Sequence, residues 1–235
     1  MTEMSEALTT TMLGLPSTTA VPPGKGRLTK EAFYRGMELT SRLKRQFVED
    51  IDSLTMIAVI RTKETGIPEG DRVREISVIE VQPKEDCLPL AVLEAFARFR
   101  DDNTRHSAKV LYIIPDGYGF KTAVFRNANV KAGNAEGRVY VSEHRTLNGS
   151  GVVLNGSNLN QVWDSLCAQT ALNDATPSQV DRRIAIQERI IRLRKEQQRL
   201  EAAHARTRQI TKRNELWQQL RAITTELDQL QGEQQ

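Results

Sequence analysis

The chain has 235 residues, of which 39% are hydrophobic and 27% charged, and a net charge of +3; it is too apolar for a disordered protein and slightly polar for one compact globule. It has no run of 18 apolar residues, and its acidic N-terminus has no continuous apolar stretch, which excludes a membrane span and a secretory signal. Two cysteines, Cys87 and Cys167, are too few for a disulfide framework or a multi-thiolate metal site, and we therefore expect a reducing, cytoplasmic setting.

The first half of the chain predicts an arm, a helix and two strands. Residues 1–28 are rich in Thr, Pro, Gly and Ser without periodicity, which predicts a flexible N-terminal arm. From Thr29 to about Asp50, apolar residues recur at steps near three and four, as in an amphipathic helix. Strands are then expected at 54–61 and 74–82, on either side of the turn-forming sequence GIPEGD.

The following segment completes the predicted sheet. Residues 88–100 have the spacing of a helix, and 109–115 (KVLYIIP) are almost continuously apolar, as in a central strand covered on both faces. Asp116-Gly117 predicts a tight turn into a strand at 120–126, and 138–143 predict another strand. Residues 29–174 are therefore interpreted as an α+β domain with a small mixed, largely antiparallel sheet and flanking helices.

Two further helices are predicted after this sheet. Residues 146–158 are rich in Gly, Ser and Asn and predict a loop with a short strand at 152–154, after which Asn158 can cap a helix that ends near Asn173. Thr176-Pro177-Ser178-Gln179 matches the N-cap, N1 and N3 preferences of a helix start. Residues 176–235 are therefore predicted to form a C-terminal helical region.

Apolar residues in this C-terminal region follow the 4-3-4-3 spacing of a coiled coil in two separate runs. The runs differ in phase by two residues, which requires either a helical hairpin or a change of partner surface between His204 and Asn214. Because no Gly or Pro occurs there, a continuous helix is favoured over a hairpin. The predicted coiled-coil interface consists of Ile186, Ile190, Leu193, Leu200, Leu216, Leu220, Ile223, Leu227 and Leu230.

The same region carries the basic excess of the chain. Residues 182–213 contain 11 basic and 3 acidic residues, a balance that attracts polyanions or an acidic protein surface. The alternative interpretation is that these basic residues form an ordinary solvated helix face. No aromatic residues alternate with the cations, so base stacking and sequence-specific readout are not indicated. The candidate nucleic-acid-binding or partner-binding residues are Arg182, Arg183, Arg189, Arg192, Arg194, Lys195, Arg199, Arg206, Arg208, Lys212 and Arg213.

An acidic residue before one predicted strand and another on the next could hold a divalent metal beside a phosphate. Asp52 and Glu80 occupy these places, in an order of helices and strands that resembles the PD-(D/E)XK nuclease pattern. The position of the activating lysine is Gln82, which has no charge, and Lys84 lies beyond Pro83. A degenerate core without catalysis is therefore favoured over a nuclease that uses Mg²⁺ or Mn²⁺. Ser142, Glu143 and His144 have no partner at a recognisable spacing and are interpreted as surface residues.

Four segments of the chain together resemble an uncharacterised bacterial family, a domain of unknown function. They are LPSTTAVPPGKGRLTKEAFY at 15–34, REISVIEVQPKE at 74–85, KVLYIIPDGYGFKTAVF at 109–125 and QITKRNELWQQLRAITTEL at 209–227. The resemblance rests on a Leu-Pro segment with a Lys-x-x-Phe-Tyr motif, an apolar strand ending in acidic and lysine residues, and an Asn-Glu-Leu stretch in the last helix. The chain departs from this pattern at Gln82-Pro83, where the family more often has leucine and lysine.

This resemblance implies a role in defence against foreign DNA, because family members are expected near helicases, DNA methyltransferases and restriction-like genes. The favoured hypothesis is a non-catalytic adaptor subunit of a DNA-acting anti-phage defence complex. Its expected partners are a helicase, nuclease or methyltransferase, DNA through phosphate contacts, and a second copy through the C-terminal helix. No cofactor and no membrane association are expected. The alternative is a divalent-metal-dependent nuclease with a divergent site at Asp52, Glu80, Gln82 and Lys84, and a third hypothesis is a purely self-associating structural protein.

Overall fold

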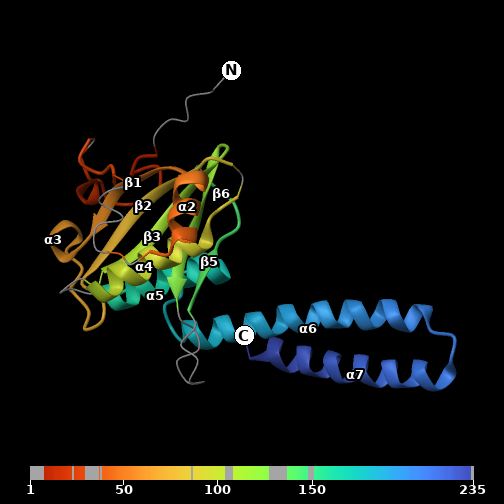
Figure 1. Ribbon diagram of the computed structural model, residues 1–235. Helices are drawn as coiled ribbons and strands as arrows, with labels where there is room; N and C mark the ends of the chain where they lie inside the picture. Colours follow the sequence, from red (N-terminus) through yellow and green to blue (C-terminus); the bar gives the residue numbers. More distant parts are fainter. Residues whose placement is uncertain are drawn as a thin grey trace. The chain divides into compact units, whose positions relative to one another are not determined.

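A mixed six-stranded sheet is the centre of the computed structural model, which describes residues 8–22, 24–29, 37, 39–85, 87–103, 108–126, 137–147 and 151–233 (Figure 1). The chain divides into two units, Met1–Val180 and Asp181–Gln235. The sheet belongs to the first unit, and a pair of long helices makes up the second. None of the helices in the described part of the chain is long and apolar enough to cross a membrane.

The sheet confirms the predicted α+β class. From β1 to β5 the neighbouring strands follow chain order, and β6 pairs with β4. Among the described strands only the β2–β3 pair is parallel, because helix α4 (Leu90–Asn103) crosses over between these two strands. Residues of β2 and β3 are buried on both faces, as the apolar run at 109–115 predicts. The strands are β1 (Ile51–Ile60), β2 (Glu75–Pro83), β3 (Ala108–Asp116), β4 (Gly119–Arg126), β5 (Arg138–Val141) and β6 (Arg145–Thr146), the last of which also pairs with β4.

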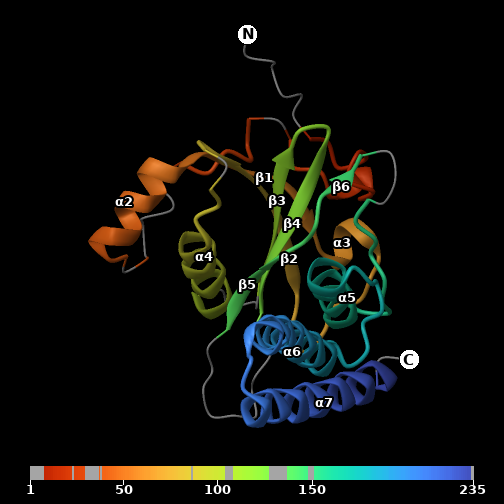
Figure 2. The same cartoon turned by 90° about the vertical axis from the view of Figure 1, so that its right-hand side faces the viewer.

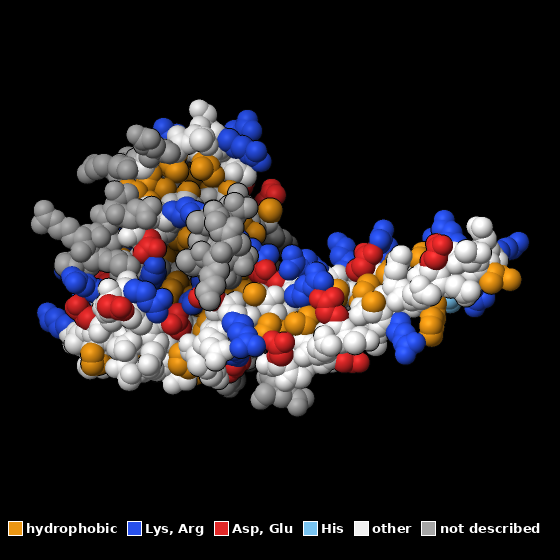
Figure 3. Space-filling model, turned by 90° about the horizontal axis from the view of Figure 1, so that it is seen from below, with side chains coloured by type: hydrophobic (Ala, Val, Ile, Leu, Met, Phe, Trp, Pro, Cys, Tyr) orange, Lys and Arg blue, Asp and Glu red, His pale blue; other side chains and the backbone are white. Residues whose placement is uncertain are grey.

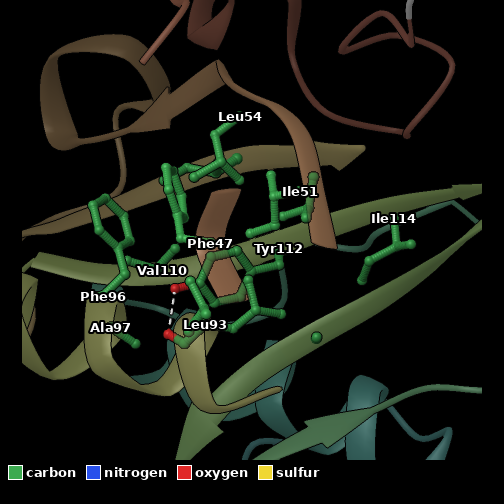
Figure 4. Packing of buried hydrophobic residues seen from close by; sticks show 13 residues of the cluster. Phe47, Ile51, Leu54, Leu93, Phe96, Ala97, Val110, Tyr112 and Ile114 are labelled. Carbon is green, nitrogen blue, oxygen red and sulfur yellow. Dashed lines mark hydrogen bonds between the residues drawn. The ribbon is translucent and has the colours of Figure 1, made fainter. Parts of the chain in front are cut away.

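Helices cover both faces of this sheet, with α2 and α4 on one side and α5 on the other (Figure 2). The core under α2 and α4 contains Phe47, Leu93 and Tyr112, and the Tyr112 hydroxyl donates a 2.7 Å hydrogen bond to the Leu93 carbonyl (Figure 4). The helical elements are a 3₁₀ turn, η1 (Ser17–Thr19), and the α-helices α2 (Ser41–Asp50), α3 (Thr62–Thr65), α4 (Leu90–Asn103), α5 (Leu159–Leu172), α6 (Val180–Arg206) and α7 (Ile210–Gly232).

Capping residues determine where several helices begin and end. The Asn158 side chain accepts a hydrogen bond from the Gln161 backbone N–H, and Asn173 adopts a left-handed conformation after the last turn, so both predicted ends of α5 are confirmed. The predicted helix over 29–50 is confirmed from Ser41 to Asp50, where Thr40 caps α2 by accepting a bond from the Leu43 N–H, but it is not continuous, because Met37 and Leu39 are not helical. The rest of that predicted helix, at 30–36 and 38, lies outside the described residues.

The interpretation of residues 1–28 as a flexible arm is wrong for their described part. Leu8, Leu13 and Leu15 are buried, with Leu13 fully inaccessible to solvent. Residues 20–22 and 24–28 run along the outer edge of β1, where backbone hydrogen bonds join them to that strand. The segment is ordered because it covers an edge strand whose N–H and C=O groups need partners.

Replacement of Leu13 by alanine is expected to lower the free energy of unfolding by about 3 kcal/mol, because the site becomes a cavity in a packed interior. Chemical denaturation followed by circular dichroism measures this change. Thr11→Ala, at an exposed position in the same segment, should change stability by less than about 0.5 kcal/mol. Equal small effects of both substitutions would show that the segment is a free arm.

The C-terminal helices form an antiparallel hairpin, so the predicted continuous helix is wrong (Figure 1). Helicity stops at 207–209, within the polar stretch where the two apolar frames change phase, because reversal lets each apolar stripe cover the other. The predicted helix start at Thr176 is also wrong: Gln179 has a positive φ of 49°, which a helix cannot contain, and α6 begins at Val180.

Candidate functional sites

The residues of the predicted nuclease site lie around the paired ends of β1 and β2. Asp52 is exposed in β1, at an irregularity in the register between Ile51 and Ser53. Glu80 is half-buried in β2 opposite Thr55, and Gln82 follows on the same face, opposite Ser53.

Lys84, the fourth residue of the predicted nuclease site, is held at the C-terminal end of α2. Its ammonium donates a 2.7 Å hydrogen bond to the Val48 carbonyl, and its backbone N–H donates one to the Asp50 carbonyl. A lysine at this place satisfies carbonyl groups at a helix end. Within the described residues, no group of three or more His, Cys, Asp or Glu side chains is placed to hold a metal ion.

The environment of Glu80 disfavours its charged form. Burial raises the pKa of its carboxyl, while the backbone N–H of Leu8 donates to the carboxylate and acts in the opposite direction. In the unfolded chain the pKa has its ordinary value, so the unfolded chain releases this proton at a lower pH than the folded chain does, and a rise in pH between the ordinary and the raised pKa favours unfolding. The contribution of Glu80 to the free energy of unfolding therefore falls as the pH rises from acid to neutral.

The Glu80→Gln substitution is expected to raise stability at pH 7, because it removes a half-buried charge and leaves an oxygen that can accept from Leu8. The gain should be about 0.5 kcal/mol, the size usual for a substitution that leaves packing unchanged. It should disappear in acid, below the ordinary pKa of a glutamate carboxyl, where the wild-type side chain is neutral in both the folded and the unfolded chain. Thermal unfolding at both pH values tests this sign, and a loss of stability at pH 7 would contradict it.

The predicted interface residues of the C-terminal region line the inner faces of the hairpin. Ile186, Ile190, Leu193 and Leu227 form a buried cluster, against which Ile223 and Leu230 pack. Leu200 is also buried, whereas Leu216 and Leu220 are partly exposed. These residues therefore pack within one chain, and contacts with a second copy stay a prediction.

Ion pairs across and along the hairpin use a minority of the predicted basic residues. Arg189 of α6 pairs with Glu226 of α7 at 2.6 Å, and Arg182 of α6 pairs at 2.9 Å with Glu233, the residue that follows α7. Arg199 pairs with Glu196 one turn earlier on α6. Six of the predicted basic residues, all exposed and all in the described part of the hairpin, make no side-chain ion pair or hydrogen bond: Arg192, Arg194, Lys195, Arg206, Arg208 and Lys212.

The turn of the hairpin carries cations with no acidic residue among them in the sequence. Residues 202–214 contain four basic side chains and no acidic one, at Arg206, Arg208, Lys212 and Arg213. All four are exposed, and the Arg213 Nε lies 3.4 Å from the His204 Nε2. Figure 3 shows blue Lys and Arg side chains along both edges of the helical hairpin, with red acidic and orange apolar side chains exposed among them. We call these four residues the turn cations.

Sequence reasoning missed a cluster at the end of the β3–β4 hairpin. One oxygen of Asp116, Oδ2, accepts from the Lys121 ammonium at 2.8 Å and from the His144 Nδ1–H at 3.2 Å. Both bonds lower the pKa of the Asp116 carboxyl, with the bond from Lys121 the larger cause. The turn at Asp116-Gly117 predicts that the strands on either side of it pair, which brings Lys121 near Asp116. His144 lies in the connection between β5 and β6, and no sequence pattern there predicts that it contacts Asp116.

The fold and these surfaces define an α+β protein in which a mixed sheet is followed by a basic helical hairpin. The chain belongs to the family described as a domain of unknown function, DUF4391, whose model matches residues 13–227. This match confirms the family-level resemblance seen in the sequence. No curated protein and no solved structure matches the chain.

Proposed function

We propose that the protein is a non-catalytic adaptor subunit of a bacterial DNA-acting defence complex. In this proposal the helical hairpin contacts DNA phosphates, and the α+β unit binds a helicase, nuclease or methyltransferase. The observation that carries it is the set of exposed hairpin cations without ion-pair or hydrogen-bond partners, three of them on α6 before the turn and three around the turn.

The physical basis is the release of counterions from DNA when lysine and arginine neutralise its phosphates. Cations already paired with carboxylates, such as Arg189 with Glu226, contribute less because the pair must be broken or shared. The turn cations have no acidic residue within the same stretch of sequence. Binding of this kind is independent of sequence, which suits a subunit that holds another protein on DNA.

Affinity purification of the tagged full-length protein, co-expressed with the genes that flank it, tests the proposal. Half of the lysate is treated with a nuclease before purification, and the mass of each eluted assembly is measured. We expect a stoichiometric complex with a DNA-acting enzyme that survives nuclease treatment, and duplex DNA bound by the purified assembly. A monomer or homodimer that binds neither partner nor DNA would overturn the proposal.

A metal titration separates this function from the nuclease alternative. The assembly and the protein alone are incubated with duplex DNA and either Mg²⁺ or Mn²⁺. Cleavage that Glu80→Ala abolishes, in protein shown to be folded, would support the nuclease and contradict a non-catalytic role. Cleavage that depends only on the partner enzyme would agree with the adaptor.

A further inference from the structure

A cavity of about 450 Å³ opens on the α4 side of the sheet, where β2 and β3 end. All its walls belong to the first unit of the chain. Six of its eight lining residues are apolar, and two are charged. The lining residues are Pro83, Leu88, Leu90, Ile114, Pro115, Asp116, Lys121 and Val141.

The apolar wall of this cavity is accessible to solvent. Leu90 is 43% exposed and Val141 is 38% exposed, although both are large apolar side chains. Covering them with an apolar group would remove hydrocarbon surface from water, which stabilises a complex. The volume lies within the range of about 300–1,000 Å³ that is usual for small-molecule sites.

The charged corner of the cavity determines which ligand chemistry fits it. Asp116 is already paired with Lys121, and His144 donates a second hydrogen bond to the same oxygen. A cationic ligand would therefore meet a carboxylate whose charge is balanced. The Lys121 ammonium has three N–H donors, of which Asp116 takes one, and its side chain is 41% exposed. The corner consequently offers donors to an anionic acceptor.

We propose that this cavity binds an apolar carboxylate, with the hydrocarbon part against Leu90 and Val141 and the carboxylate on the Lys121 ammonium. Two sources have this chemistry: a free aliphatic or aromatic acid, and the C-terminus of a polypeptide that ends in an apolar residue. The site is independent of the proposed DNA contacts, because none of its residues lies on the hairpin.

Binding to the full-length protein tests this site with defined probes. The probes are 4-phenylbutyrate, an acetylated tripeptide ending in phenylalanine, and the C-terminal amide of each. Isothermal titration calorimetry measures affinity. We expect at least one acid to bind about tenfold or more tightly than its amide, since a charge-assisted hydrogen bond is lost in the amide. Binding of only the butyrate identifies a free acid as the source, and binding of only the peptide identifies a C-terminus.

Three variants locate the bound probe. Lys121→Met keeps the length of the side chain and should remove the preference for acid over amide, whereas Lys63→Met, on the exposed helix α3, should not. Val141→Trp fills the cavity from a partly exposed position and should abolish binding of acids and amides alike. Circular dichroism checks that each variant is folded. Equal affinity for acid and amide, no binding of either acid, or binding unchanged by Val141→Trp would overturn the proposal.

Discussion

Replacement of the turn cations, Arg206, Arg208, Lys212 and Arg213, by alanine is expected to lower the affinity for duplex DNA by about tenfold to a thousandfold near 0.1 M salt. The reason is that each lost phosphate contact reduces the number of counterions released. The slope of log affinity against log salt should become shallower by about 3 to 4 for four contacts. Fluorescence anisotropy with a labelled duplex at several salt concentrations measures both quantities.

Two matched variants show whether position or charge alone is responsible. Arg182→Ala with Arg189→Ala removes cations that are paired with Glu233 and Glu226, and should change the salt slope by less than about 1. Arg-to-Lys substitutions at 206, 208 and 213 preserve charge and should retain most of the affinity, because a phosphate accepts from either side chain. An unchanged slope after loss of the turn cations would show that they are only a solvated surface.

Local signals predicted the centre of the sheet and the helix packed on its second face. The run KVLYIIP became the buried strand β3, because a strand covered on both faces requires continuous apolar sequence. Asn158 and Asn173 marked both ends of α5, since capping depends on backbone groups a few residues away. These features depend on neighbours in sequence, and they could therefore be predicted from it.

Features that depend on distant contacts could not be predicted in this way. Leu13 lies among Thr, Pro and Gly residues and has no periodic neighbours, and its burial depends on a segment that covers the edge of β1. The break at 207–209 has no Gly or Pro, and reversal occurs because the stripe of α6 packs on that of α7. The cluster of Asp116, Lys121 and His144 combines two strands and a later connection, which only the folded chain brings together.

The close packing around this cluster leads to a second large expected loss of stability, similar to that of Leu13→Ala. A Cβ atom on Gly119 would lie 2.0 Å from the Arg145 carbonyl oxygen, and 2.7 and 2.8 Å from two atoms of the His144 ring. Arg145 is held in place, because its buried guanidinium donates to the Gln169 carbonyl of α5 and its backbone pairs β6 with β4. Gly119→Ala must therefore separate β6 from β4 or displace the imidazole.

We expect Gly119→Ala to lower the free energy of unfolding by about 3 kcal/mol, the upper range for overpacking in a well-packed interior. The matched control is Gly117→Ala in the same turn, where the φ of 59° is strained for alanine but no atom lies within 4 Å of the added carbon. That control should cost only about 1 kcal/mol. Urea denaturation gives both values, and NMR of the His144 ring should report an altered environment in the Gly119 variant alone. Equal losses would show that backbone conformation, and not the approach of β6, makes glycine necessary at position 119.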